Sequence, residues 1–434
     1  MQRMKTVSQW DWIVPKLEDL KAKNLFRQFR VLEDVKATSA IIEGRRVTLF
    51  CGNDYLGLCH HPRLIKAAHG VLRSHGVGAG SARLIAGTSH WHDALETRIA
   101  KFLGKESALI FSSGYLANLG ALSALTEPND LVILDKLSHA SLIDAARLCR
   151  ATVRVYPHRN LGYLEKVLKT NSTARHPEAA SQSDAEGSRP EGRRWGGESR
   201  SGFFGCLRRP QNDVGRVWIV TDSLFSMDGD LAPLRELVEL KNRYGAYLII
   251  DEAHATGVYG AGGRGVSEHL GVMDEIDVHI GTCSKAIGTL GGFVAGSTEL
   301  IQYLVNHART FIFDTALPAS ACAASIKALD LIDEAPELRA SLWRNSEKLR
   351  NGLDHVGASL LINEASPIVP VVLGDEKKAL EASDFLLREG FLVPAVRYPT
   401  VPRGKARLRV TLSAAHSDFE IDQFLAVCQK FFMS

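Results

Sequence analysis

The chain reads Thr282-Cys283-Ser284-Lys285-Ala286-Ile287-Gly288 directly after an apolar run that is typical of a buried strand. A second apolar run, Tyr247 to Asp251, ends in an acid and continues as Asp251-Glu252-Ala253-His254. Short continuous apolar runs are typical of parallel strands, and the polar residues that follow them lie at the carboxyl edge of the sheet. The sequence therefore predicts that one amine, one carboxylate and one imidazole meet at that edge.

Two further strand ends carry polar residues. The run Ala108 to Phe111 leads into Ser112-Ser113-Gly114-Tyr115 and then into a helical pattern from Leu116 to Leu125. Because the first N–H groups of a helix have no intrahelical partner, this strand-turn-helix is a natural anion site. His139 follows the predicted strand Leu131 to Leu134, so its imidazole can reach the same edge.

Together these groups match what pyridoxal phosphate requires of a protein. Its aldehyde needs a lysine amine, its ring nitrogen a carboxylate, and its phosphate N–H donors. Lys285 is the expected Schiff-base residue, Asp251 the partner of the ring nitrogen, and the turn at Ser113 the phosphate site. Each residue alone has an ordinary explanation, since a lysine after a strand is commonly a solvated charge. Their order in one chain favours the cofactor.

The chain also resembles a known family, the fold-type I pyridoxal-phosphate enzymes of the α-oxoamine synthase group. These enzymes join an amino acid to an acyl-CoA with loss of carbon dioxide. The resemblance covers nearly the whole chain. Its motifs are Asn53–Leu58, Gly80–Leu84, His92–Glu96, Leu137–Ser141, Phe225–Asp230, Asp251–Gly257, Thr282–Gly288 and Thr400–Arg409.

The C-terminal motif discriminates best within this group. Thr400–Arg409, with Leu412–His416 behind it, is most similar to members that condense L-alanine with pimeloyl-CoA, or with a pimeloyl carrier-protein thioester, in biotin biosynthesis. Members that join glycine to acetyl-CoA are the alternative. Acyl chain length and the choice of alanine, glycine or serine stay open, because both depend on pocket shape.

The resemblance implies a role for each matching residue. Lys285 would be the Schiff-base lysine and the base that removes the α-proton, which requires a lowered pKa. His139 would stack on the cofactor ring, Asp251 would pair with the ring nitrogen, and His254 would contact the ring hydroxyl. The full cofactor-binding set is Ser113, Gly114, Tyr115, His139, Ser226, Asp251, His254, Thr282, Lys285 and Thr315.

The substrate carboxylate is expected at Arg409, with Asn53 beside it. Arg27, on a loose alignment, is the candidate for the acyl substrate. Arg407 is expected to be a surface charge. Asp314 departs from the family pattern, because an ionised carboxylate before Thr315 would repel the phosphate. Either Thr315 carries that contact or Asp314 points elsewhere.

The predicted fold class is α/β, with a mostly parallel, doubly wound large domain and a small α+β C-terminal domain. Strand and helix patterns alternate from about residue 60 to 300, which favours such a sheet. The expected parts are an N-terminal arm (1–59) with a helix from Pro15 to Arg30, a large cofactor domain (60–317) and a small domain (318–434). The stretch 171–215 is rich in Ser, Arg, Gly, Glu and Pro, so it is predicted to be a disordered insertion.

Composition limits the remaining possibilities. A net charge of +3 over 434 residues does not favour nucleic-acid or membrane binding, and no apolar stretch is long enough for a bilayer span. The seven cysteines form no Cys-x-x-Cys pair, so neither a disulfide framework nor a metal site is expected. A cytoplasmic protein is the expectation, with a removed organellar transit peptide left open. The family resemblance implies a homodimer with each active site between subunits.

A nucleotide-dependent dehydrogenase is the alternative from another enzyme class. Its phosphate loop would be Gly76-Val77-Gly78-Ala79-Gly80. No clear strand precedes these glycines and Ser81 follows them, so the spacing does not fit a dinucleotide-binding turn.

Overall fold

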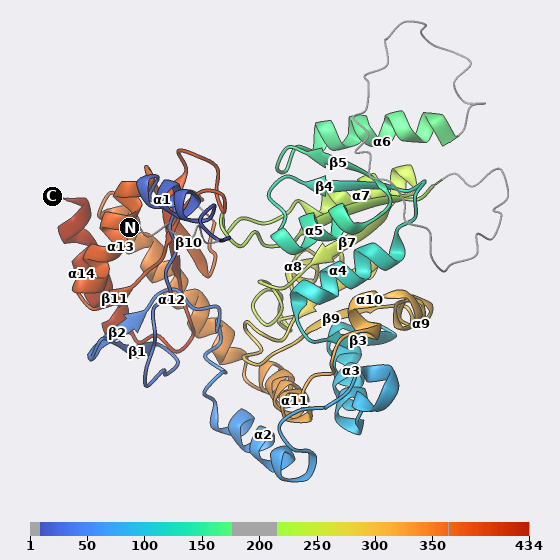
Figure 1. Ribbon diagram of the computed structural model, residues 1–434, viewed down its shortest axis with the longest axis horizontal. Coiled ribbons are helices and arrows are strands. Elements are labelled where there is room, and N and C mark those ends of the chain that lie inside the picture. The colour runs from blue at the N-terminus through green and yellow to red at the C-terminus, as the bar shows by residue number, and fades with distance from the viewer. Residues whose placement is uncertain (1–8, 176–214, 363, 434) are drawn as a thin grey trace, which may run out of the picture.

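The computed structural model describes residues 9–175, 215–362 and 364–433. Most of the predicted insertion at 171–215 therefore lies outside the described residues. The described chain forms two lobes, one built on a large central sheet and the other on two small sheets, with α11 (Ala319–Glu334) and α12 (Pro336–His355) passing between them (Figure 1).

Seven strands form the central sheet in the order β3-β9-β8-β7-β6-β4-β5. The neighbours from β8 to β5 are parallel, and β9 is antiparallel to both β8 and β3. This confirms the prediction of a mostly parallel α/β sheet. The strands are β3 (Ser107–Phe111), β4 (Leu131–Asp135), β5 (Thr152–Tyr156), β6 (Val217–Asp222), β7 (Tyr247–Asp251), β8 (Val278–Thr282) and β9 (Gly292–Gly296).

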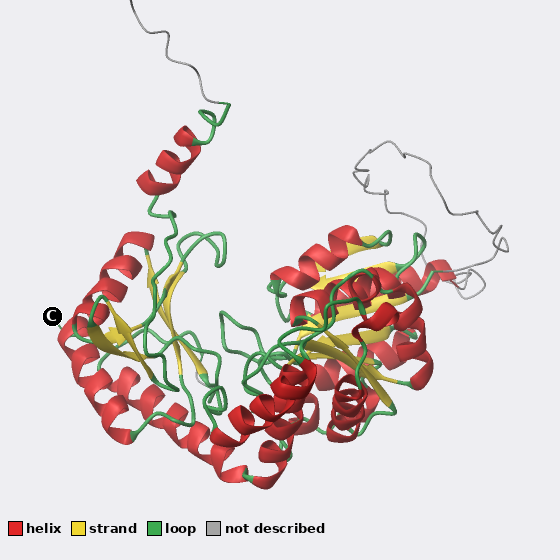
Figure 2. Cartoon of the chain, turned by 60° about the horizontal axis from the view of Figure 1, so that its bottom comes forward, coloured by secondary structure: helices red, strands yellow, loops and turns green. Residues whose placement is uncertain are grey.

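Both faces of this sheet are covered by helices (Figure 2). In β4, Ile133 belongs to one apolar core and Val132 and Leu134 to the other, so successive side chains are buried on opposite faces. The surrounding helices are α3 (His90–Leu103), α4 (Gly114–Leu125), α5 (Ala140–Leu148), α6 (Leu161–Arg175), α7 (Leu234–Tyr244), α8 (Val266–His269), α9 (Thr298–His307) and α10 (Arg309–Ile312), with short turns η1 (Arg83–Gly87) and η3 (Met273–Glu275).

The second lobe combines both ends of the chain. One small sheet has the order β1-β2-β11, so the N-terminal hairpin pairs with a C-terminal strand, and the other has the order β10-β13-β12. The strands are β1 (Ser39–Ile42), β2 (Arg45–Leu49), β10 (Ile368–Gly374), β11 (Phe391–Leu392), β12 (Ala395–Val396) and β13 (Ala406–Thr411). Helices α13 (Glu376–Arg388) and α14 (Asp418–Phe432) pack on this lobe, whereas α2 (Pro62–His75) packs against α11.

The N-terminal helix is shorter than predicted. Helix α1 covers Val14–Ala22, whereas the sequence pattern predicted a helix from Pro15 to Arg30. Asn24 has a φ of 55°, which ends the helix. No residue of α1 is buried, and the helix stands away from the body of the protein (Figure 2), so packing adds nothing to hold further turns.

Candidate active site

Two carboxylates lie side by side where β6 and β7 end. Asp251 is buried and accepts hydrogen bonds from the Ala253 N–H (2.8 Å) and from Asn118 Nδ2 (2.6 Å). Asp222 pairs with Asp251 in the strand register. Burial, followed by the charge of Asp251, raises the pKa of Asp222 well above its ordinary value. Burial and the neighbouring Asp251 charge therefore favour the protonated form of Asp222.

Lys285 lies in the turn after β8. This turn is closed by the Cys283 N–H, which donates to the Gly291 carbonyl (2.9 Å). Burial lowers the pKa of the Lys285 amine to about 8, against the opposing charges of Asp251 and Asp222. A lysine with this pKa is partly neutral near pH 7, which is the form that can act as a nucleophile or a base.

Two imidazoles lie near these groups. His139 is the N-cap of α5. Its backbone N–H donates to Asp222 Oδ2 (2.9 Å), and its ring Nδ1 contacts Ser141 Oγ (2.7 Å). His254 is buried, and its Nδ1 lies 2.7 Å from the Tyr55 hydroxyl. Burial is the main cause that lowers the pKa of both histidines, with a further contribution from the charge of Lys285. Both rings are therefore neutral at pH 7.

The turn before α4 packs closely against the end of β8. Ser113 is the N-cap of α4, and its Oγ accepts from the Leu116 N–H (3.2 Å). A Cβ on Gly114 would lie 3.2 Å from the Thr282 Cβ, so a larger residue would crowd β8. The Thr282 hydroxyl donates to the Gly291 carbonyl (2.7 Å). The first N–H groups of α4 have no intrahelical acceptor, which makes this turn suited to an anion.

Arg409 lies on β13, in the second lobe, and is buried. Its Nε donates to the Ser226 carbonyl (2.6 Å), and its Nη2 to Asn53 Oδ1 (3.3 Å) and the Tyr55 hydroxyl (3.5 Å). The structure thus brings Arg409 and Asn53 together, and the Ser226 backbone with them. The Arg409 charge also acts on the pKa of Lys285 and His254, so the two groups of residues face each other.

The expectation for Arg407 is wrong. Its side chain is only 3% exposed, and it donates to Asp228 Oδ1 (2.9 Å) and to the Met227 carbonyl (3.1 Å). Residues 407 and 409 are two apart on one strand, so both side chains point to the same face. That face packs against the loop that contains Ser226, Met227 and Asp228.

Three predicted site residues lie apart from the groups around Lys285 and Arg409. Tyr115 is exposed, and its hydroxyl donates to Asp144 on α5. Arg27 is exposed on the segment after α1, where its charge adds to the effect of burial in lowering the pKa of Arg397. Thr315 is exposed, and its N–H donates to Asp314 Oδ1 (2.9 Å). Asp314 also accepts from Ser112, so its carboxylate turns toward the segment before the phosphate turn.

Sequence reasoning missed three residues of the site: Asp222, Asn118 and Tyr55. Asp222 ends β6 as Asp251 ends β7, so the strand-end pattern contained its signal. Asn118 lies four residues after Gly114, on the same face of α4. Tyr55 is inside the Asn53–Leu58 motif, but its contact with His254 spans 199 positions and leaves no local pattern.

Comparisons with known proteins show the family of the chain. The family model of class I and II aminotransferases matches residues 45–427. An 8-amino-7-oxononanoate synthase of Geotalea daltonii is 42% identical over 94% of each chain, and one of Thermoanaerobacter pseudethanolicus is 40% identical over 98% of each. A serine palmitoyltransferase variant of S. paucimobilis with a bound PLP-myriocin aldimine superposes with a TM-score of 0.83, at 30% identity over 98% of each chain. An 8-amino-7-oxononanoate synthase of Francisella tularensis gives 0.69, at 26% identity over 89% of this chain and 97% of that one.

Proposed function

Because this chain belongs to the class I and II aminotransferase family, and within it to the 8-amino-7-oxononanoate synthases, we propose that it joins L-alanine to a pimeloyl thioester. The acyl donor is pimeloyl-CoA or a pimeloyl carrier protein. The products are 8-amino-7-oxononanoate, carbon dioxide and the free thiol, in biotin biosynthesis. The enzyme is thus an acyltransferase that depends on pyridoxal phosphate.

The residues at the sheet edge fit that cofactor. The Lys285 amine would hold its aldehyde, the Asp251 carboxylate its ring nitrogen, and the start of α4 at Ser113 and Gly114 its phosphate. Because Gly114 has no Cβ, this turn can pack closely against the Thr282 side chain at the end of β8. When bound, the cofactor supplies an electron sink for negative charge at the substrate's α-carbon.

The protein's own residues then bind, orient and move protons. Two nitrogens of Arg409 are held by Ser226, Asn53 and Tyr55, whereas Nη1 has no partner within the described ranges. We assign this free edge to the substrate carboxylate, which a guanidinium holds in a fixed orientation. The neutral Lys285 amine takes the α-proton of the amino acid and later returns it.

One observation carries the proposal. The Tyr55 hydroxyl lies 2.7 Å from His254 Nδ1 and 3.5 Å from Arg409 Nη2, so Arg409 of the second lobe meets the residues at the sheet edge. The charges of Asp251 and Arg409 both act on the pKa of the Lys285 amine. A base, an acid for the ring nitrogen and a carboxylate anchor therefore lie around one space. This arrangement suits α-proton removal from an amino acid.

We also propose that the enzyme is a homodimer with each active site between subunits. Large apolar side chains are exposed near the site, in and around η1 and before Thr315. They are Val77 (85% exposed), Ile85 (82%), Phe313 (70%) and Leu84 (51%). Apolar groups gathered in this way are commonly covered by another protein surface. A partner subunit would also cover Thr315.

Location and domain limits are proposals of the same kind. Six cysteines lie in the described ranges, and all are free thiols, which suits the reducing cytoplasm. None of the helices in those ranges combines the length and apolar character of a membrane span. We retain 1–59, 60–317 and 318–434 as sequence divisions, although β2 of the first pairs with β11 of the last.

The test is to follow the cofactor spectrum of the purified enzyme while L-alanine, glycine and L-serine are added in turn, and then to measure thiol release with each acyl thioester. We expect the fastest release with L-alanine and a pimeloyl thioester. A response to glycine and acetyl-CoA alone would assign the chain to the glycine C-acetyltransferase reaction. A response to L-serine and a long-chain acyl-CoA would favour serine palmitoyltransferase, in line with the fold comparison.

A further inference from the structure

The loop between β6 and α7 extends from the large lobe and contacts the second lobe. We call residues 223–231 the Ser226 loop. Its base is closed by a bridge between Leu224 and Leu231 and by the Phe225 N–H, which donates to the Asp230 carbonyl (3.0 Å). Inside it, the Gly229 N–H donates to the Phe225 carbonyl (2.8 Å). The loop is therefore a compact unit closed by its own backbone hydrogen bonds.

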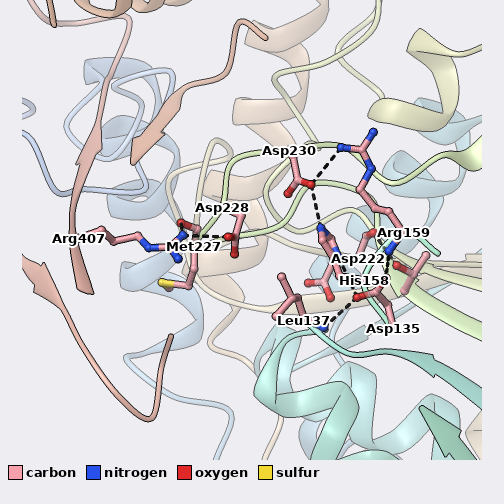
Figure 3. Close-up of polar contacts among 10 residues, drawn as sticks. Asp135, Leu137, His158, Arg159, Asp222, Met227, Asp228, Asp230 and Arg407 are labelled. Carbon is pink, nitrogen blue, oxygen red and sulfur yellow. Dashed lines mark hydrogen bonds and ion pairs between the residues drawn. The ribbon is translucent and has the colours of Figure 1, made fainter. Parts of the chain in front are cut away.

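The tip of the Ser226 loop holds the arginines of β13. The Ser226 carbonyl accepts from Arg409. Met227 and Asp228 accept from Arg407 (Figure 3). Gly229 has a φ of +75°, and a Cβ there would lie 2.5 Å from the Ile368 carbonyl of β10. The tip is thus pressed against the second lobe, and its position sets that of Arg409.

The base of the loop is tied to the large sheet by His158, which follows β5. His158 Nδ1 lies 3.0 Å from Asp135 Oδ1, at the end of β4, and Nε2 lies 2.8 Å from Asp230 Oδ2 (Figure 3). Ionised carboxylates only accept hydrogen bonds, so both ring nitrogens must carry protons. The Phe225 ring meets the imidazole edge-on at 4.4 Å. His158 is therefore a charged link between Asp135 and the loop.

Arg159 is the other cation at this point, and it shares both carboxylates with His158, so its positive charge opposes the charge on His158. The Arg159 side chain donates to Asp230 (3.2 Å), and the Arg159 N–H donates to Asp135 Oδ2 (3.0 Å). Burial disfavours the charge on His158, but its hydrogen bonds to Asp135 and Asp230 outweigh burial and raise the pKa of His158 to about 9. His158 is thus charged at neutral pH and loses the charge in mildly alkaline solution.

We propose that His158 is a positioning residue for the amino-acid substrate: its imidazolium fixes the Ser226 loop to the ends of β4 and β5, and the loop fixes Arg409. The inference rests on the proposed function, since Arg409 is there the carboxylate anchor. It assigns His158 no contact with substrate or cofactor. Its loss therefore weakens amino-acid binding and leaves the acyl thioester and the chemical step largely unaffected.

The experiment compares the holoenzyme with two variants, His158→Gln and Arg159→Gln. Glutamine cannot carry the charge or bridge both carboxylates, so the half-saturating L-alanine concentration should rise about 10-fold, as for loss of one charged hydrogen bond. The KM for the pimeloyl thioester and kcat should change by less than about 3-fold. Arg159→Gln removes the exposed side chain that also contacts Asp230. It should change kcat and both half-saturating concentrations by less than about 2-fold.

Two further measurements do not depend on turnover of a variant. In the wild type, the half-saturating L-alanine concentration should rise above pH 9, and this inflection should be absent in His158→Gln. Hydrogen exchange at the Phe225 and Gly229 amides of the holoenzyme should be faster in His158→Gln than in Arg159→Gln. If His158→Gln does not fold, the wild-type dependence of L-alanine saturation on pH above 9 still decides.

The outcomes separate the two proposals. Unchanged L-alanine saturation and loop exchange in His158→Gln would overturn the positioning role, as would equal losses in kcat and in both KM values. A wild-type enzyme that ignores L-alanine would instead reject the proposed function. In that case, if hydrogen exchange at the Phe225 and Gly229 amides does not accelerate in His158→Gln, His158 does not fix the Ser226 loop either.

Discussion

The site has two sides that are held in different ways. On the sheet side, Asp251 is the last residue of β7, and Lys285 and His139 lie in the short turns after β8 and β4, so the central sheet holds all three at its edge. On the arginine side, Asn53 and Arg409 come from the two ends of the chain, 356 positions apart, and meet through side chains and the Ser226 loop. A sheet edge stays in place when one side chain is lost, whereas the arginine side depends on each contact between the lobes. Cofactor retention and amino-acid binding should therefore be separable by mutation.

The largest effect is expected from Lys285→Ala, which removes the attachment point on the sheet side. The variant should lack the visible absorption band of lysine-bound pyridoxal phosphate, and kcat should fall by at least about 10³-fold, because the base is lost as well. The measurements are the spectrum after incubation with the cofactor and the rate of thiol release. A variant that keeps the band would show that another amine holds the cofactor.

The next largest effect is expected from Arg409→Ala, on the arginine side. Removing a charged partner should raise the half-saturating L-alanine concentration by about 10²-fold, since a charged hydrogen bond contributes about 1.5–3 kcal/mol. The absorption band should remain, because no sheet-edge residue is touched. Spectral titration with L-alanine measures the absorption band and the half-saturating concentration in one sample. Loss of the band in this variant would contradict the separation of the two sides.

The matched control for that experiment is Arg407→Ala. Arg407 lies on the same strand and contacts the same loop, but through Asp228 and Met227. If its substitution weakened L-alanine binding as much as that of Arg409, the loop as a whole, rather than the Arg409 guanidinium, would set the affinity.

The sequence predicted the sheet side far better than the arginine side. The run Tyr247 to Asp251 is β7 with the predicted limits, because an apolar run buried on both faces leaves a clear signal in consecutive residues. The sequence predicts Arg407 as a surface charge, because nothing near it in sequence reveals Asp228, which is 179 positions away. The helix after Pro15 was predicted too long because its apolar positions have no packing partner in the fold.

A smaller effect, on rate, follows from the pKa of Lys285 on the sheet side. The neutral amine is the form that reacts with the cofactor, and its pKa is lowered from 10.5 to about 8. Below pH 8 the rate of cofactor uptake by the cofactor-free protein should therefore fall about 10-fold per pH unit, and above pH 8 it should level off. Stopped-flow absorbance from pH 6 to 10 measures this. A rate that still rises tenfold per unit at pH 9.5 would mean that the amine has an ordinary pKa.

The smallest effect is expected from Tyr55→Phe, at the point where the two sides touch. The Tyr55 hydroxyl lies 2.7 Å from His254 Nδ1 but 3.5 Å from Arg409 Nη2, so its stronger contact is with the sheet side. The buried ring stays in place, and one neutral hydrogen bond contributes about 1 kcal/mol, which corresponds to a loss in kcat of about 5-fold. The half-saturating L-alanine concentration should change by less than about 2-fold, as steady-state kinetics can measure. The opposite pattern, with kcat intact and L-alanine binding weakened, would place Tyr55 on the arginine side.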